Sequence, residues 1–153
     1  TQRDRTTTQE YNGSTWSNSN NCSTGVSQAA TFGTQSAGVK ATGASGGSSS
    51  VDTTTCETYN GTSWSSTGSM STGRRYAAGF GSSSKGYVSG GENGGTDQQS
   101  TETFNGSTWS SDTNLPAAKS IAAQGMGGDT SANGFLAGGI SGGSVVDTMY
   151  SAS

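Results

Sequence analysis

The sequence predicts an all-β fold built from about three repeats of roughly 46 residues. Three observations support this: aromatic residues that recur at a fixed interval, glycine pairs in phase with them, and a scarcity of large aliphatic residues. Hydrophobic residue types make up 27% of the 153 residues, far below the roughly 45–50% of an average globular domain. The chain has two leucines and two isoleucines, so no segment carries the apolar stripe of an amphipathic helix. Helical bundles and doubly wound sheets are therefore excluded.

The repeat is defined by a short motif, aromatic-Asn-Gly-x-x-Trp, which occurs three times. Its copies are Tyr11–Trp16, Tyr59–Trp64 and Phe104–Trp109. The tryptophans lie 48 and 45 residues apart, and Tyr150 lies 46 residues beyond Phe104, where a further copy would begin. All three tryptophans belong to this motif, so we expect the aromatic–Trp pairs to be repeated anchors of the core. Each buried ring removes on the order of 150–250 Å² from water.

The Asn-Gly pair inside each motif predicts a hairpin turn. A two-residue hairpin loop that matches the twist of its strands needs positive φ at both central positions, and Asn-Gly adopts that conformation at the least cost. We therefore expect turns at Asn12-Gly13, Asn60-Gly61 and Asn105-Gly106.

Glycine pairs recur in phase with the aromatic motif. Gly46-Gly47, Gly90-Gly91 and Gly138-Gly139 each follow a short strand-like run and precede the next aromatic by about a dozen residues. Each unit then reads as four short strands: a small-residue strand, a strand closing on Gly-Gly, a Thr-rich strand ending in the aromatic, and a strand opening on Trp. We divide the single repeat domain, 1–153, into a partial blade (1–24), two blades (25–70 and 71–116) and a second partial blade (117–153).

Four-stranded units of this length have the size of a β-propeller blade. The glycine pair, the aromatic and the Trp resemble degenerate Kelch or galactose-oxidase-type repeats. The compact Tyr-Asn-Gly-x-x-Trp form is similar to Ser/Thr/Gly-rich repeats in structural and tail-fibre proteins of marine bacteriophages. The resemblance implies a β-propeller-like array of four-stranded antiparallel blades with a structural or adhesion role in a virion or an extracellular assembly. A β-solenoid-like repeat array is the alternative fold.

The number of strands leaves open how the array is completed. Typical propellers have about four to eight blades, and the chain supplies two whole units and two partial ones. Residues 1–24 could complete the last unit as a closing clasp. That would give only three blades, so we infer either a fragment of a longer propeller or a protomer that completes its ring or filament with copies of itself, because unpaired sheet edges invite pairing with another chain. We expect homo-oligomers or contacts with parent-chain or virion proteins.

Candidate catalytic groups are few. The absence of histidine excludes Ser-His-Asp and Cys-His arrangements, and two cysteines are too few for a typical thiolate zinc site. A glycan hydrolase would need two carboxylates across a cleft, but Glu57 and Glu102 each lie two residues before the repeated aromatic, which indicates a role in the fold. We therefore expect no catalytic, cofactor-binding or metal-binding residues. The alternatives are a carboxylate-based glycan hydrolase on a propeller and a Kelch-like protein-binding adaptor.

The charge and polarity of the chain limit the kinds of partner that it can bind. Seven cationic residues and a net charge of −3 cannot form a basic track along nucleic acid, and no apolar run is long enough to span a membrane. The surface rich in Ser and Thr suits a virion or extracellular location, where the loops could bind a host glycan or protein. Cys22 and Cys56 form a candidate disulfide, which that location would tolerate.

Overall fold

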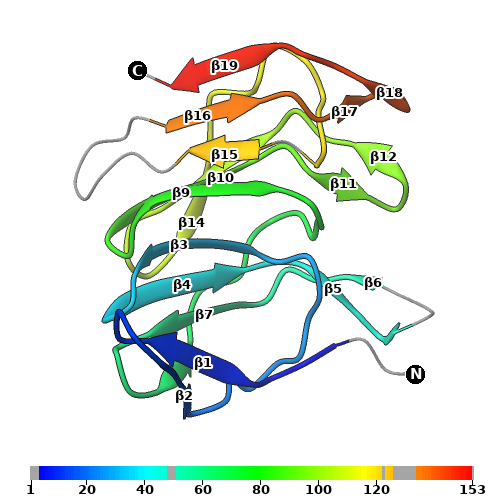
Figure 1. The fold of residues 1–153 in the computed structure, drawn as a ribbon. Coiled ribbons are helices and arrows are strands. Elements are labelled where there is room, and N and C mark those ends of the chain that lie inside the picture. The colour runs from blue at the N-terminus through cyan, green and yellow to red at the C-terminus, as the bar shows by residue number, and fades with distance from the viewer. Residues whose placement is uncertain (1–3, 48–50, 122, 126–133, 153) are drawn as a thin grey trace.

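The computed structural model describes residues 4–47, 51–121, 123–125 and 134–152. It is an all-β, β-propeller-like array in which antiparallel sheets follow one another along the chain (Figure 1). Among the described residues, no helix is long and apolar enough to cross a membrane.

The sheets share one strand order. The N-terminal hairpin pairs β1 (Thr8–Tyr11) with β2 (Trp16–Ser19). The first sheet has the order β3 (Ala30–Thr34), β4 (Ala37–Ala41), β7 (Cys56–Tyr59), β8 (Trp64–Ser66). The second sheet has the order β9 (Ala78–Ser82), β10 (Lys85–Ser89), β13 (Thr101–Phe104), β14 (Trp109–Asp112). The third sheet has the order β15 (Ala123–Gly125), β16 (Gly134–Ala137), β19 (Met149–Ala152).

A short hairpin, which the sequence analysis did not anticipate, interrupts each unit between its second and third strands. These hairpins are β5 (Ala44–Ser45) with β6 (Val51–Asp52), β11 (Glu92–Asn93) with β12 (Thr96–Asp97), and β17 (Ile140–Ser141) with β18 (Ser144–Val145). All three lie on the same side of the array, which we call the hairpin face (Figure 1).

The short hairpins correct one glycine assignment. Gly90-Gly91 and Gly138-Gly139 directly follow the second strand of their sheets, but in the first sheet that place is taken by Thr42-Gly43. Thr42, Gly90 and Gly138 share the same left-handed backbone, with φ of 57°, 66° and 64°. Gly46-Gly47 instead lies in the β5–β6 connection, which is longer than its counterparts, so spacing from the next aromatic aligned the wrong pair.

The predicted turns occur at the Asn-Gly positions, but with a different geometry. The strands end at Tyr11 and resume at Trp16, so four residues form the connection, and the asparagines do not have positive φ. In the first turn, Asn12 Oδ1 accepts hydrogen bonds from the backbone N–H groups of Ser14 and Thr15, both at 2.9 Å, and the other two turns repeat this pattern. Gly13, with φ of 97°, supplies the left-handed residue. Asparagine therefore acts through its side chain, as in an Asx turn.

The aromatic–Trp pairs recur with nearly the same ring geometry, but the first pair does not anchor the core as predicted. In each copy the two rings are cross-strand neighbours with centroids 5.2, 4.9 and 4.9 Å apart and planes inclined by 36°, 36° and 33°. Tyr59 and Phe104 are buried, whereas Tyr11 and Trp16 of the N-terminal hairpin are 47% and 68% exposed.

Tyr150 does not occupy the fourth aromatic position. Tyr59 and Phe104 pair with Gly38 and Gly86, but Tyr150 pairs with Leu136, two residues away from the equivalent Gly134. Tyr150 therefore takes the place that Glu57 and Glu102 hold in the other sheets, and the interval of 46 residues was a misleading guide to register.

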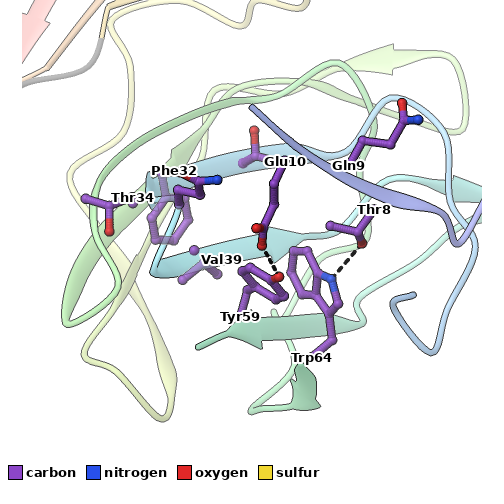
Figure 2. Close-up of a pocket in the computed structure, with 12 residues that line it drawn as sticks. Thr8, Gln9, Glu10, Phe32, Thr34, Val39, Tyr59 and Trp64 are labelled. Carbon is purple, nitrogen blue, oxygen red and sulfur yellow. Dashed lines mark hydrogen bonds between the residues drawn. The ribbon is translucent and has the colours of Figure 1, made fainter. Parts of the chain in front are cut away.

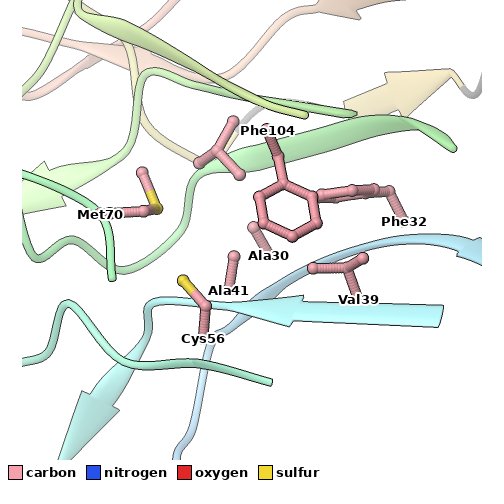
Figure 3. Close-up of a cluster of buried hydrophobic side chains, with 8 residues drawn as sticks. Ala30, Phe32, Val39, Ala41, Cys56, Met70 and Phe104 are labelled. Atoms are coloured by element: carbon pink, nitrogen blue, oxygen red, sulfur yellow. The ribbon is translucent and has the colours of Figure 1, made fainter. Parts of the chain in front are cut away.

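The core consists of layers between successive sheets. Phe32, Val39 and Cys56 of the first sheet pack against Val88 and Phe104 of the second (Figure 3). A second cluster joins the second and third sheets and contains Ala78, Phe80, Tyr87, Leu115 and Leu136, with Tyr150 packed beside it. Rings and small residues thus replace the missing aliphatic mass.

The N-terminal hairpin does not act as a closing clasp. It lies beside the first sheet, at the end of the array opposite β19 (Figure 1). Along the described chain, β1 is paired with β2 alone.

Candidate functional site

A pocket of about 390 Å³ opens between the N-terminal hairpin and the first sheet (Figure 2). Strand β1 forms one wall, and Tyr59 and Trp64 form another. The complete lining is Thr8, Gln9, Glu10, Thr31, Phe32, Gly33, Thr34, Gln35, Gly38, Val39, Tyr59 and Trp64.

Hydrogen bonds tie the two walls together. The Tyr59 hydroxyl donates to Glu10 Oε1 and also lies within hydrogen-bond distance of the Ser19 hydroxyl. Trp64 Nε1 donates to Thr8 Oγ1 at 2.8 Å. The hydrogen bond to Glu10 raises the pKa of Tyr59 above its ordinary value, so the phenol keeps its proton.

The pocket has an aromatic wall but little catalytic chemistry. Glu10 is the one acidic residue in its lining, and the tyrosine beside it donates to that carboxylate. A glycosidase places two carboxyl groups roughly 5–10 Å apart, and this lining does not supply that pair. In the part of the chain that the structure describes, no group of three His, Cys, Asp or Glu side chains could hold a metal ion.

A second set of carboxylates holds the hairpin face. Asp4 Oδ2 accepts hydrogen bonds from the N–H groups of Gly46 and Gly47 at 2.8 and 3.0 Å. Asp52 accepts from Gly94 at 2.8 Å, and Asp97 accepts from Gly142 at 2.9 Å. Each short hairpin is therefore fixed by an aspartate from the preceding unit.

This set of aspartates was missed in the sequence but could have been found there. Asp4, Asp52 and Asp97 each lie seven residues before the repeated aromatic, at Tyr11, Tyr59 and Phe104. A carboxylate in phase with the repeat indicates a structural acceptor.

Two buried ion pairs occupy the equivalent place in the first and second sheets. Lys40 Nζ lies 2.5 Å from Glu57 Oε2, and Arg74 lies 3.1 Å from Glu102 Oε1. Each glutamate also accepts hydrogen bonds from two successive backbone N–H groups in the loop before the first strand of its sheet: Ser23 and Thr24 for Glu57, Ser71 and Thr72 for Glu102. In the third sheet, Lys119 Nζ lies 4.4 Å from the centre of the Tyr150 ring instead. The glutamates thus serve the fold, as their repeated position indicated.

The Lys40–Glu57 pair predicts an acid-sensitive fold. Burial alone would raise the pKa of Glu57, but hydrogen bonds from Lys40 and Ser23, with the Lys40 charge, lower it below 4.5. The unfolded chain therefore binds more protons, and the stabilisation by Glu57 is complete above pH 4.5 and is lost as the pH falls through the folded-state pKa. Urea denaturation at a series of acidic pH values measures how the free energy of unfolding changes with pH. We expect this change to be less steep in Glu57→Gln than in the parent chain. Asp147→Asn, at an exposed position, should keep the slope of the parent chain.

The cysteines do not form the candidate disulfide. Cys22 and Cys56 are both buried and free. Cys22 lies in the loop after β2 and its thiol contacts the carbonyl oxygens of Thr6 and Thr24, whereas Cys56 belongs to the core layer between the first and second sheets. Burial raises the pKa of the Cys56 thiol, which makes it a poor nucleophile.

The stacked four-stranded sheets define the class of the protein as a β-propeller-like repeat array. No family model and no curated protein matches the chain by sequence. Among solved structures, the chain is similar to YjhT, with a TM-score of 0.70 and 14% sequence identity. The similarity covers 88% of this chain and 45% of the YjhT chain, so this chain spans less than half of that protein. At this identity the likeness shows the fold alone.

Proposed function

We propose that the chain is a non-enzymatic structural or adhesion module of a virion appendage or another extracellular assembly. On this proposal, the hairpin face binds a host glycan or protein. The resemblance to Ser/Thr/Gly-rich phage repeats supports the setting.

The observation that carries the proposal is the use of the carboxylates. Asp4, Asp52 and Asp97 fix the short hairpins, and Glu57 and Glu102 neutralise buried cations. An acid whose oxygens are engaged in this way is a poor general acid or nucleophile. These five acidic residues therefore stabilise the hairpins and the buried cations of the repeat.

The hairpin face offers a surface suited to recognition. Gly94, Gly95, Gly142 and Gly143 are exposed and have open space where a side chain would lie, while Asp52 and Asp97 hold the N–H groups of Gly94 and Gly142. Val51 and Val145 are 65% and 88% exposed on β6 and β18. Exposed apolar side chains beside exposed glycines suit an uncharged polar ligand.

A glycan array combined with an activity assay tests this function. We expect at least one surface glycan to bind without turnover, and Val51→Asp and Val145→Asp to weaken binding at least tenfold. Thr62→Asp, in the exposed turn between β7 and β8, is the matched control and should leave binding unchanged. Turnover that is lost on substitution of an Asp or Glu would show a hydrolase, and an array without any bound glycan would contradict glycan adhesion.

A Kelch-like protein-binding adaptor is the second candidate, and the free cysteines favour it. Two reduced thiols are expected of a protein in a reducing compartment. Binding of a defined peptide to the hairpin face, with no glycan bound, would support this function over adhesion.

A further inference from the structure

The second and third sheets of the array each receive an aromatic ring from the sheet before them. The Phe32 ring lies where a side chain at Gly86 would be, and the Phe80 ring lies where one at Gly134 would be. Phe32 also meets Phe104 and Trp109 edge-on, at centroid distances of 6.5 and 6.1 Å. Glycine at this position of the second strand is thus a seat for a ring.

Gly38 is the same seat in the first sheet, and it is empty. It pairs with Tyr59 as Gly86 pairs with Phe104. Among the described residues, a Cβ atom at Gly38 would meet only the Thr34 carbonyl oxygen at 3.3 Å and Tyr59 Cβ at 3.6 Å, with no ring atom within 4 Å. Gly38, Tyr59 and Trp64 line the pocket described above (Figure 2). The pocket is therefore an aromatic seat without its ring.

The opposite end of the array carries an exposed ring. Phe135 in β16 is 45% exposed and pairs with Gly125 in β15. The equivalent pairs in the first and second sheets are Phe32 with Val39 and Phe80 with Tyr87. In the third sheet, Gly125 thus lies at the position that Phe32 and Phe80 hold in the other sheets, and Phe135 of the neighbouring strand β16 supplies the ring instead.

We propose that a second copy of this chain closes the pocket. Strand β19 leaves the edge of β16 that it occupies in the single chain, and that edge of β16 pairs with the free edge of β1 in the other copy. This pairing directs Phe135 into the pocket, against Tyr59 and Trp64. The same contact forms a second time about a two-fold axis. It is separate from ligand binding at the hairpin face, so either can fail without the other.

In this assembly β1 takes the place of β19 beside β16. Strand β1 ends in Tyr11, as β7 and β13 end in Tyr59 and Phe104, whereas β19 ends in Ala152. In the register of the other sheets, Tyr11 pairs with Gly134, and the exposed Tyr11–Trp16 pair covers Phe80. Burial of the Tyr11–Trp16 pair offsets the loss of the contact between Tyr150 and that core cluster when β19 leaves β16.

The number of sheets in the assembly agrees with that of known propellers. The first and second sheets of each copy, with the two sheets shared between copies, give a closed ring of six four-stranded sheets. Propellers have about four to eight blades. The chain matches 45% of YjhT, so two copies approach the extent of that fold.

Size-exclusion chromatography with light scattering, which measures the mass of the particle in solution, tests the assembly. We expect a particle of twice the 15.2 kDa chain mass, and Phe135→Ser and Trp16→Ser should each raise the dissociation constant of the dimer at least tenfold. Val145→Ser, an exposed apolar position on the hairpin face, is the control and should not change it. A monomer, an open filament, or a dimer unaffected by both variants would overturn the proposal.

A designed crosslink tests the register. Thr58 pairs with Val39 in the first sheet, and the equivalent pair between copies is Glu10 with Phe135. The double variant Glu10→Cys/Phe135→Cys should form a covalent dimer on oxidation, because paired strand positions lie within disulfide reach. Glu10→Cys/Val145→Cys is the control and should stay uncrosslinked. Equal crosslinking of both variants, or none of either, would count against the proposed pairing.

Discussion

Glu102→Gln is expected to lower the free energy of unfolding by about 3–5 kcal/mol, because it leaves a buried guanidinium without its counter-ion. The Arg74 side chain is fully buried, and its NH2 group lies 3.1 Å from Glu102 Oε1. Burial lowers the pKa of Arg74 and the Glu102 charge acts against this, so the pair keeps the arginine charged. Glutamine keeps the volume of the side chain and removes the charge. Urea denaturation at neutral pH measures the loss.

The matched control is Glu92→Gln, which also removes a carboxylate paired with an arginine. Arg75 and Glu92 are 2.5 Å apart, but their side chains are 19% and 20% exposed, and Arg75 keeps a second carboxylate, Asp52 Oδ1 at 3.6 Å, when Glu92 is replaced. We expect this variant to lose about 0–1 kcal/mol. Equal losses at the two sites would mean that burial of Arg74 does not control the effect.

The repeated features of the fold were predictable because each has a local physical cause. A motif with an aromatic, a turn-forming Asn-Gly and a Trp fixes a hairpin with two stacked rings, and the ring geometry is nearly identical in the copies that begin at Tyr11, Tyr59 and Phe104. In the described chain, the layers between sheets use only one of these pairs, Phe104–Trp109, together with rings such as Phe32 and Phe80.

The features that the sequence analysis missed depend on contacts between units. Nothing local marks Arg74 as buried, since it lies in the loop before β9 and its partner Glu102 lies 28 residues away in β13. The short hairpins have only two residues in each strand, too few to show alternation, and the aspartates that fix them act across units. The pocket is a gap in the stacking of sheets, so it has no sequence motif of its own.

Phe32→Ala is expected to cost about 3–5 kcal/mol, because the ring fills the layer between the first and second sheets and its removal leaves a cavity. Gly86→Ala is expected to cost on the order of 1–3 kcal/mol, since its methyl group would overlap the Phe32 ring. Both losses are read from urea denaturation of the single variants.

The double variant separates a seated ring from two unrelated defects. The three atoms nearest to a methyl group at position 86 all belong to the Phe32 ring, so Gly86→Ala should cost little in the Phe32→Ala background. The two losses should then fall short of additivity by about 0.5–3 kcal/mol. Phe80→Ala with Gly86→Ala is the matched control: the Phe80 ring packs over Gly134 in the next layer, so its loss should add to that of Gly86→Ala. Additive losses in the Phe32 pair would contradict the seat at Gly86 and, with it, the interpretation of Gly38 as an empty one.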